Sequence, residues 1–227
     1  MSEPLIWCIC PTTDKYRDFL PRAIESFRAQ SYGYKRLLVW DTSEGNTPYI
    51  GQSPLISHRP PAEIAHTVGG LRNDAIESII HEADYIAHFD VDDVSSPDRL
   101  SVQLAHIQKT GKLLTGFYNM PLHDAKNEKT WIYANEDHRY ALGTSLFYRR
   151  EAWERVKFPD QTPEDNKWRK DVGLDNCESQ SCFRSDGSPI MVQTVHGGNA
   201  SARIYPSSAR YSPATAEQSR IVKEMLK

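Results

Sequence analysis

Apolar and polar residues follow two different spacings along the first half of the chain. Uninterrupted apolar runs predict three buried strands, over residues 5–10, 36–40 and 85–89. Elsewhere apolar residues recur every three or four positions and predict helices over 20–30, 71–82 and 97–110. Ser96 is the expected N-cap of the last helix, and Gly111 is expected to end it. Strand, helix and strand at this spacing form a βαβ unit, so we expect a mostly parallel sheet flanked by helices.

The second half of the chain has a less regular pattern. It predicts strands over 112–120, 130–134, 143–148 and 189–195, the first two forming a hairpin. Helices are expected over 151–156, in part of 171–182, and from Ser212-Pro213 to about 227. Residues 41–65 are rich in Gly, Pro, Ser and Asn, which indicates a long surface loop with a short strand at 55–57.

The composition is typical of a globular protein with one domain. The chain has 227 residues, of which 39% are apolar and 25% charged, enough for one α/β core. The net charge of −3 gives no electrostatic reason to expect nucleic acid as a partner. No apolar run reaches the length of a membrane span, and the N-terminus lacks a signal-peptide pattern. The four cysteines have neither zinc-site nor redox-motif spacing, so we expect a reduced, cytoplasmic protein.

Three carboxylates lie within four residues at the end of the third predicted strand. They are Asp90, Asp92 and Asp93. In α/β sheets, ligands bind at the carboxyl ends of the strands. Carboxylates this close repel one another, a divalent cation relieves the repulsion, and oxygen ligands suit Mg²⁺ or Mn²⁺. The alternative is a solvated acidic turn that caps the following helix.

Further polar residues are expected at the same edge of the sheet. Thr12 and Thr13 follow the first strand, and Asp41 follows the second. Arg72-Asn73 opens the helix before the acidic strand, and an arginine suits a diphosphate. Pro11-Thr12-Thr13 contains no glycine, which excludes the Gly-rich turn of dinucleotide-binding folds. The alternatives are that Asp41 only forms a turn and that Arg72 is a solvated helix residue.

The order of these motifs resembles the nucleotide-binding half of family 2 glycosyltransferases of the GT-A fold. The matching stretches are Pro11-Thr12-Thr13, Gln30-Ser31-Tyr32, Asp41-Thr42-Ser43, Val68-Gly69-Gly70-Leu71-Arg72-Asn73, Asp90-Val91-Asp92-Asp93 and Pro97-Asp98-Arg99-Leu100. They cover about the first 110 residues, and the Arg-Asn and Asp-x-Asp-Asp pair is the most specific part. Downstream, residues 143–150 resemble the stretch that precedes the family's acceptor-side carboxylate.

The resemblance implies one α/β domain of the GT-A fold over residues 1–227, with a mostly parallel central sheet flanked by helices. Residues 1–110 would form the nucleotide-sugar-binding half, 111–205 the acceptor half and 206–227 a C-terminal helix. It also implies a metal-dependent transfer of a sugar from a nucleotide-diphosphate sugar, expected to be a UDP-sugar, to an acceptor hydroxyl. The acceptor could be a glycan, a lipid-linked sugar or a small molecule. Direct displacement would invert the anomeric centre.

The resemblance also implies roles for the residues of the nucleotide side. Thr12 and Asp41 would hold the base and ribose, and Arg72, with Asn73 beside it, would lie near the base or the diphosphate. Asp90 and Asp92 would span the ribose, the sugar and the metal.

The resemblance implies a cation as well, Mn²⁺ or Mg²⁺. Asp93 would be a direct ligand, although the sequence leaves open which of Asp92 and Asp93 touches the metal. His196 follows the last strand and precedes two glycines, and it is a candidate third ligand. The alternative is an exposed turn histidine.

The family uses a carboxylate as general base, often within a Gly-Glu-Asp pattern. The nearest match is Gly173-Leu174-Asp175, which makes Asp175 the candidate base. Asp171 and Glu164-Asp165 are rivals. The base must reach an acceptor hydroxyl within hydrogen-bond distance. The alternative for Asp175 is a surface carboxylate paired with Arg169 or Lys170.

Two other functions remain as alternatives. A nucleotidyltransferase of related fold would release pyrophosphate, but it normally needs a Gly-rich basic loop after the first strand. A non-catalytic module would bind sugar nucleotides without turnover. Trp131, Trp153 and Trp168 could stack on a sugar, although buried aromatic residues are more often part of a core.

Overall fold

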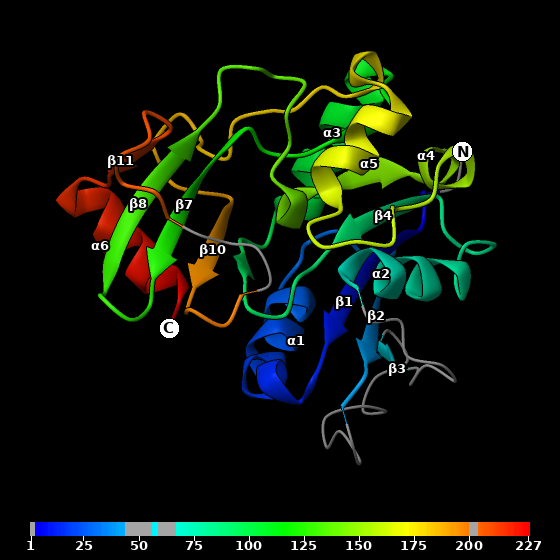
Figure 1. Ribbon diagram of the computed structural model, residues 1–227, viewed down its shortest axis with the longest axis horizontal. Helices are drawn as coiled ribbons and strands as arrows, with labels where there is room; N and C mark the ends of the chain where they lie inside the picture. The colour runs from blue at the N-terminus through cyan, green and yellow to red at the C-terminus, as the bar shows by residue number, and fades with distance from the viewer. Residues whose placement is uncertain (1–2, 44–55, 59–66, 200–203) are drawn as a thin grey trace.

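The computed structural model describes residues 3–43, 56–58, 67–199 and 204–227, which form two β-sheets with helices around them (Figure 1). The larger sheet has six strands, in the order β3 (Ile56–His58), β2 (Lys35–Asp41), β1 (Ile6–Thr12), β4 (Tyr85–His88), β9 (Phe147–Arg149) and β6 (Leu114–Thr115). The pairs among β3, β2, β1 and β4 are parallel, and β9 pairs antiparallel with β4 and β6. The predicted α/β fold with a mostly parallel central sheet is confirmed.

The second sheet has five strands. Their order is β11 (Tyr211–Pro213), β8 (Lys129–Ala134), β7 (Asn119–Asp124), β10 (Met191–Val195) and β5 (Val94–Ser95). β7 and β8 form the predicted antiparallel hairpin. Between β4 of the larger sheet and β5 of the second sheet the chain has only residues 89–93, so the acidic segment joins the two sheets.

Helices cover both faces of the larger sheet. α1 (Leu20–Arg28), which follows the 3₁₀ helix η1 (Asp14–Phe19), and α3 (Arg99–Thr110) cover one face, whereas α2 (Val68–Glu77), α4 (Arg150–Arg155) and α5 (Asp165–Val172) cover the other. Along β1, Cys8 and Cys10 pack on the α1 and α3 side, and Trp7 and Ile9 pack on the α2 side. Because both faces are buried, these strands read as uninterrupted apolar runs.

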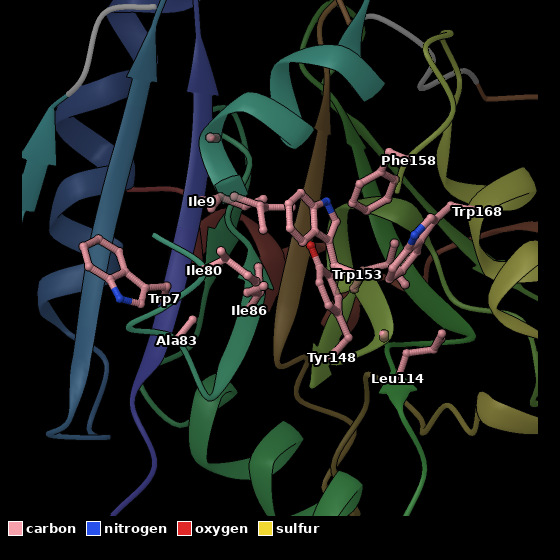
Figure 2. Close-up of a cluster of buried hydrophobic side chains, with 14 of the residues drawn as sticks. Trp7, Ile9, Ile80, Ala83, Ile86, Leu114, Tyr148, Trp153, Phe158 and Trp168 are labelled. Carbon is pink, nitrogen blue, oxygen red and sulfur yellow. The ribbon is translucent and has the colours of Figure 1, made fainter. Parts of the chain in front are cut away.

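Figure 2 shows the core between the larger sheet and α2, α4 and α5. The rings of Phe158 and Trp168 stack with their centroids 4.3 Å apart, and the Tyr148 ring lies 4.8 Å from that of Trp168. Trp153 and Trp168 are 2% and 0% exposed, so they belong to the core rather than to a sugar site. Burying one such aromatic side chain contributes about 1.5–3 kcal/mol, which holds α5 firmly on the sheet.

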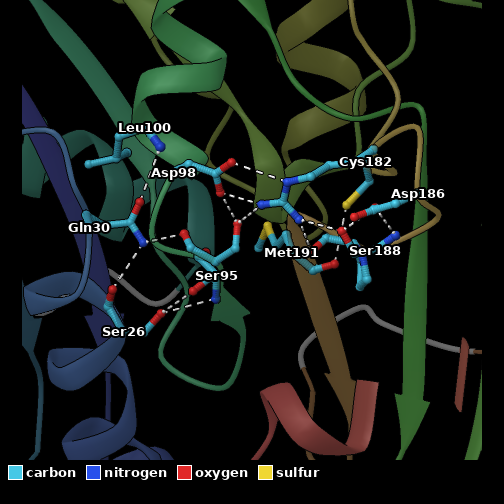
Figure 3. Close-up of polar contacts among 12 residues, drawn as sticks. Ser26, Gln30, Ser95, Asp98, Leu100, Cys182, Asp186, Ser188 and Met191 are labelled. Carbon is cyan, nitrogen blue, oxygen red and sulfur yellow. Dashed lines mark hydrogen bonds and ion pairs between the residues drawn. The ribbon is translucent and has the colours of Figure 1, made fainter. Parts of the chain in front are cut away.

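A polar network holds the start of α3 against its neighbours (Figure 3). The Gln30 amide donates to the Ser96 carbonyl at 2.8 Å. Ser96 Oγ donates to Asp98 Oδ1 at 2.6 Å and accepts from Arg184 Nη2 at 2.8 Å. Asp98, and not Ser96 as expected, occupies the N-cap position, because the Ser96 hydroxyl is committed to Asp98 and Arg184.

Some expected elements have different bounds. The expected strand over 112–120 is divided, because Leu114–Thr115 pairs with β9 and Asn119–Asp124 joins the second sheet. The expected strand over 143–148 begins as the 3₁₀ helix η2 (Gly143–Ser145). The segment 171–182 is helical only in part, as expected. α5 ends before Gly173, whose φ of 101° favours glycine, and only the short 3₁₀ helix η3 (Leu174–Asn176) follows.

The C-terminal segment begins as a strand. Tyr211–Pro213 pairs with β8, so the helix α6 (Ala216–Met225) starts later than expected, at a capping box formed by Thr215 and Gln218. Within the described ranges, no helix is both long and apolar enough to cross a membrane. All four cysteines are buried and free. The expected division of the domain at residues 110 and 205 stays a prediction.

Candidate active site

A cavity of about 360 Å³ lies where the two sheets meet, at the carboxyl ends of β1 and β4. Thr12 and Thr13 enter it from the end of β1, Arg72 enters from α2, and Asp90, Asp92 and Asp93 enter from the segment after β4. The sequence therefore predicts correctly that these strand ends share one edge. We call Thr12, Arg72, Asp90 and Asp92 the charged wall of the cavity.

Arg72 is the centre of a buried ion-pair network on this wall. The residue is 4% exposed, its Nε donates to Glu164 Oε1 at 2.7 Å, and its Nη2 donates to Asp90 Oδ1 at 3.0 Å. Burial lowers the pKa of Arg72, but the charges of Asp90 and Glu164 outweigh it and raise the pKa. Nη1 is buried and has no hydrogen-bond partner among the described residues, so the guanidinium keeps one donor for a ligand.

Asp92 meets a histidine from the far end of the chain. His196 Nε2 lies 3.0 Å from Asp92 Oδ2, and Asn199 Nδ2 donates to the same oxygen at 2.8 Å. The Phe19 ring packs 4.8 Å from the His196 ring and fixes its position. The pKa of Asp92 is raised, because burial and the neighbouring charge of Asp90 raise it more than the contact with His196 lowers it. Carboxylate and imidazole groups are both ligand types for a divalent cation, and here the two are hydrogen-bonded to each other.

Asp93 has a different environment from Asp92. It is 4% exposed, its Oδ1 accepts from the Thr194 backbone N–H at 3.0 Å, and its Oδ2 accepts from Thr144 Oγ1. Burial, and then the charges of Asp92 and Asp90, raise the pKa of Asp93. No group of three or more His, Cys, Asp or Glu side chains in the described part of the chain is placed to hold a metal ion. Asp92, Asp93 and His196 are therefore not gathered into the expected ligand set. The Asp93 carboxylate is instead hydrogen-bonded to Thr194 of β10 and Thr144 of η2.

Thr12 and Asp41 lie on neighbouring strands at paired register positions. Thr12 is 2% exposed, and its Oγ1 is buried without a hydrogen-bond partner in the ranges that the structure describes. Asp41 is 3% exposed, and its Oδ1 accepts from the Ser43 backbone N–H at 2.9 Å. A buried hydroxyl without a partner costs free energy, which a ligand at this edge would recover.

Asn73 lies behind the cavity and supports the fold. Its Oδ1 accepts from Trp153 Nε1 and from the Phe158 backbone N–H, both at 3.0 Å, and its Nδ2 donates to the Phe158 carbonyl at 2.9 Å. The structure therefore does not bring the Asn73 side chain, expected among the nucleotide-binding residues, to the cavity. It anchors the segment that leads to Glu164.

The segment before α5 is seated on the N-terminus of α2. The backbone N–H of Val68 donates to Thr162 Oγ1 at 3.0 Å, and that of Gly69 donates to the Gln161 carbonyl at 3.3 Å. A Cβ at Gly69 would overlap the carbonyl oxygen of Pro159, so the close approach requires glycine here. The first N–H groups of α2 therefore hold this segment instead of a phosphate.

This docking places Asp165 in the cavity. Asp165 is the first residue of α5, and its carboxylate packs so closely on Gly143 that a Cβ there would overlap it. Burial raises the pKa of Asp165. Asp175, the expected base, instead lies exposed in η3, and Asp171 is exposed and paired with Lys167 Nζ at 2.6 Å. Of the carboxylates considered from the sequence as the general base, Glu164 and Asp165 are the ones that line the cavity.

The opposite side of the cavity is aromatic. Tyr133 of β8 and Tyr211 of β11 are register partners in the second sheet, and Tyr140 and Tyr205 enter from loops. We call these four residues the tyrosine wall. This wall was not expected from the sequence, although Tyr133 lies in the expected strand over 130–134.

The family model for glycosyl transferase family 2 matches residues 7–184. The chain belongs to this family. No functionally curated protein matches the chain. The match of the family model confirms the family that was expected from the sequence motifs.

Solved structures of glycosyltransferases share the fold of this family 2 chain. S. aureus TarS residues 1–349, in complex with UDP-GlcNAc, superposes with a TM-score of 0.67 at 15% identity and covers 89% of this chain and 62% of its own. Mannosyltransferase PcManGT from Pyrobaculum calidifontis, in complex with GDP-Man and Mn²⁺, gives 0.64 at 16% identity, with 88% and 59% covered. The family 2 chain thus spans less than two thirds of the length of these neighbours. At such identity the likeness shows the GT-A fold.

Proposed function

We propose that this chain transfers a sugar from a nucleotide-diphosphate sugar to an acceptor hydroxyl. The observation that carries the proposal is the charged wall, where Thr12, Arg72, Asp90 and Asp92 from three segments of the chain meet in one cavity. Two atoms of this wall, Thr12 Oγ1 and Arg72 Nη1, are buried without partners among the described residues. Family membership supports the proposal, and two neighbours of the same fold hold UDP-GlcNAc and GDP-Man.

The nucleotide lies along the ends of β1 and β2 in this proposal. Thr12 Oγ1 and Asp41 bind the base and ribose, since they are adjacent across the register of the two strands. Arg72 donates from Nη1 to the diphosphate, while its other nitrogens stay on Glu164 and Asp90. Asp90 remains partly exposed, with 26% of its side chain accessible, and faces the ribose or the transferred sugar.

Asp92 and His196 fit a divalent cation, Mn²⁺ or Mg²⁺. Asp92 Oδ2 and His196 Nε2 are hydrogen-bonded to each other at 3.0 Å, and binding of a cation would exchange this bond for bonds to the metal, while Asn199 holds the carboxylate in place. A bound cation supplies charge neutralisation for the departing diphosphate. We assign Asp93 a positioning role, because both of its oxygens already accept hydrogen bonds from Thr144 and Thr194.

Asp165 is the general base of the proposed reaction. It takes the proton of the acceptor hydroxyl, the oxygen attacks the anomeric carbon, and the bond to the nucleoside diphosphate breaks, which inverts the anomeric centre. A carboxylate whose pKa is raised by burial is a better base at neutral pH than an exposed one. Its place in the cavity favours Asp165 over Asp175, the candidate from the sequence pattern.

A thermal-shift screen tests the proposal. UDP-, GDP- and dTDP-sugars are added with and without Mn²⁺, and at least one of them should raise the melting temperature, more so with Mn²⁺. The same mixtures are then assayed for released products. Nucleoside diphosphate supports the transferase, pyrophosphate would indicate a nucleotidyltransferase, and no shift with any donor would contradict the proposal. The cytoplasmic location stays a prediction.

A further inference from the structure

The two sides of the cavity differ in the chemistry that they offer. The charged wall carries carboxylates and a guanidinium. The second sheet contributes Leu122, Tyr133, Gln193 and Tyr211 to the cavity, and no charged side chain of its described strands lines it. A phosphate, carboxylate or ammonium group on the acceptor would therefore find no ion-pair partner on the described strands of the second sheet. The side that faces an acceptor is suited to an uncharged molecule with hydroxyl groups.

The tyrosine wall is a continuous row of aromatic contacts. Ring centroids lie 6.2 Å apart for Tyr205 and Tyr211, 5.2 Å apart for Tyr211 and Tyr133, and 5.9 Å apart for Tyr133 and Tyr140. Tyr205 is 57% exposed and Tyr133 is 6% exposed. The row thus leads from the protein surface into the cavity, over a length greater than that of one aromatic ring.

The inner end of the row lies beside the proposed base. Burial, a hydrogen bond with Tyr133 and then the charge of Asp165 raise the pKa of Tyr140. Leu142 and Gly143, a few positions further along the chain, line the cavity too, and Gly143 is in close contact with Asp165. An acceptor that lies along the row therefore presents its inner end to Asp165.

The outer end of the row, the side chain of Tyr205, is exposed to solvent. Among the described residues, the large hydrophobic side chains that are exposed are Tyr34 and Tyr205. Tyr34 stands near the start of β2, at the opposite edge of the larger sheet from the cavity. Isolated exposed aromatics such as Tyr34 need no explanation, whereas Tyr205 extends a row that enters the cavity.

We propose that the tyrosine wall is the acceptor site for a neutral oligosaccharide of at least two sugar rings, a proposal that rests on the transferase function above. Tyrosine rings stack on the apolar C–H faces of sugars, and their hydroxyl groups, with the Gln193 amide, bond to sugar hydroxyls. The innermost sugar offers its hydroxyl to Asp165. The outer sugar lies on Tyr211 and Tyr205.

The experiment compares wild type with Tyr205→Ala, Tyr211→Ala and the conservative Tyr205→Phe, with Tyr34→Ala as matched control. Each is assayed on a glycan array of neutral and charged oligosaccharides and on simple alkyl and aryl alcohols, with the donor found in the thermal-shift screen. The wild type should prefer neutral glycans, with kcat/KM rising from one to three rings. Tyr205→Ala and Tyr211→Ala should raise KM for the longer glycans about fivefold. Tyr205→Phe, which keeps the ring and loses only the hydroxyl, should raise KM less than Tyr205→Ala does, and Tyr34→Ala should leave KM unchanged.

The outcomes separate this proposal from the transferase function. Donor hydrolysis measured without the acceptor should be unchanged in the control Tyr34→Ala, and the donor-induced thermal shift reports donor binding separately from the KM for the acceptor. If the chain hydrolyses a donor but transfers only to charged glycans or to simple alcohols, the acceptor proposal is wrong and the transferase function stands. Equal KM values for one, two and three rings would also overturn it. Absence of any donor binding or hydrolysis would instead remove the transferase function.

Discussion

The two walls of the cavity are assembled in different ways. The charged wall is built from the end of β1, the segment after β4 and helix α2, and its Arg72 is ion-paired with Asp90 of the same wall and with the buried Glu164. The tyrosine wall is built from two strands of the second sheet and two loops, with members as far apart as Tyr133 and Tyr211. The position of the charged wall therefore depends on the carboxyl ends of the parallel strands. The position of the tyrosine wall depends on the pairing of β11 with β8 and on two loops.

The difference indicates that recognition of the donor and recognition of the acceptor lie on different walls. Chemistry on a diphosphate needs fixed charges, and parallel strand ends place them reproducibly. Recognition of an acceptor needs shape and stacking surface, which loops and an edge strand can change without disturbing the charged wall. Substitutions on the charged wall should thus affect the donor, and substitutions on the tyrosine wall should affect the acceptor.

The largest expected effect lies at the point where the two walls meet. Asp165→Asn should lower kcat by about 100- to 10,000-fold, because the proposed base is lost, while donor binding persists. Asp175→Asn is the matched control and should keep nearly full activity, since Asp175 is exposed in η3. Steady-state kinetics of both variants decide between the two carboxylates. The reverse result would restore Asp175 as the base.

A second, smaller effect separates two adjacent residues of the acidic segment. Asp92→Asn should reduce Mn²⁺-dependent turnover by about 100-fold, because an anionic donor beside His196 is lost. Asp93→Asn should fold and retain most activity, because an asparagine can keep the hydrogen bonds to Thr194 and Thr144. Turnover titrated with Mn²⁺ measures both. Loss of metal dependence in Asp93→Asn alone would place the cation on Asp93.

The pH dependence of catalysis should reflect the burial of Asp165. Its pKa is raised in the folded protein, and the base works only when deprotonated, so kcat should fall as the pH drops through the raised pKa. Below that point the fall is about tenfold per pH unit, and it begins above the ordinary aspartate value of about 3.9. Donor affinity measured over the same range is the control, because Asp92 also titrates there. A kcat that stays constant down to that ordinary value would argue against Asp165.

The smallest expected effect concerns the unpartnered hydroxyl of the charged wall. Thr12→Val keeps the shape of the side chain but removes Oγ1, and should weaken donor binding about fivefold with little change in stability. Thr115→Val is the matched control, because Thr115 Oγ1 is also buried without a partner in the described structure but lies on β6. Calorimetric titration with the donor compares them. Equal affinities in the two variants would remove Thr12 from the donor site.

Much of the fold and of the charged wall could be predicted from the sequence, for a physical reason. β1, β2 and β4 are buried on both faces, so they give uninterrupted apolar runs, and the polar residue after each run marks a carboxyl end of the sheet. Thr12, Asp41 and Asp90 are found in this way. His196 is brought to Asp92 as the sequence suggested, because it directly follows β10.

The remaining parts depend on contacts that no local pattern shows. Asp165 reaches the cavity only because the segment before it binds the N-terminus of α2, through Gly69 and Thr162. Asn73 resembles a ligand residue in its motif, but its hydrogen bonds go to Trp153 and Phe158. Asp93 accepts a hydrogen bond from the backbone N–H of Thr194, which lies about 100 residues further along the chain, and no local pattern predicts this contact.

The most direct measurement is a calorimetric titration of UDP-, GDP- and dTDP-sugars, with Mn²⁺ present, into wild type, Thr12→Val and Tyr211→Ala. If the charged wall binds the donor as proposed, at least one donor should bind wild type, Thr12→Val should bind it about fivefold more weakly, and Tyr211→Ala should match wild type. The opposite pattern, in which Tyr211→Ala loses the donor and Thr12→Val keeps it, would contradict the division of the cavity into a donor wall and an acceptor wall.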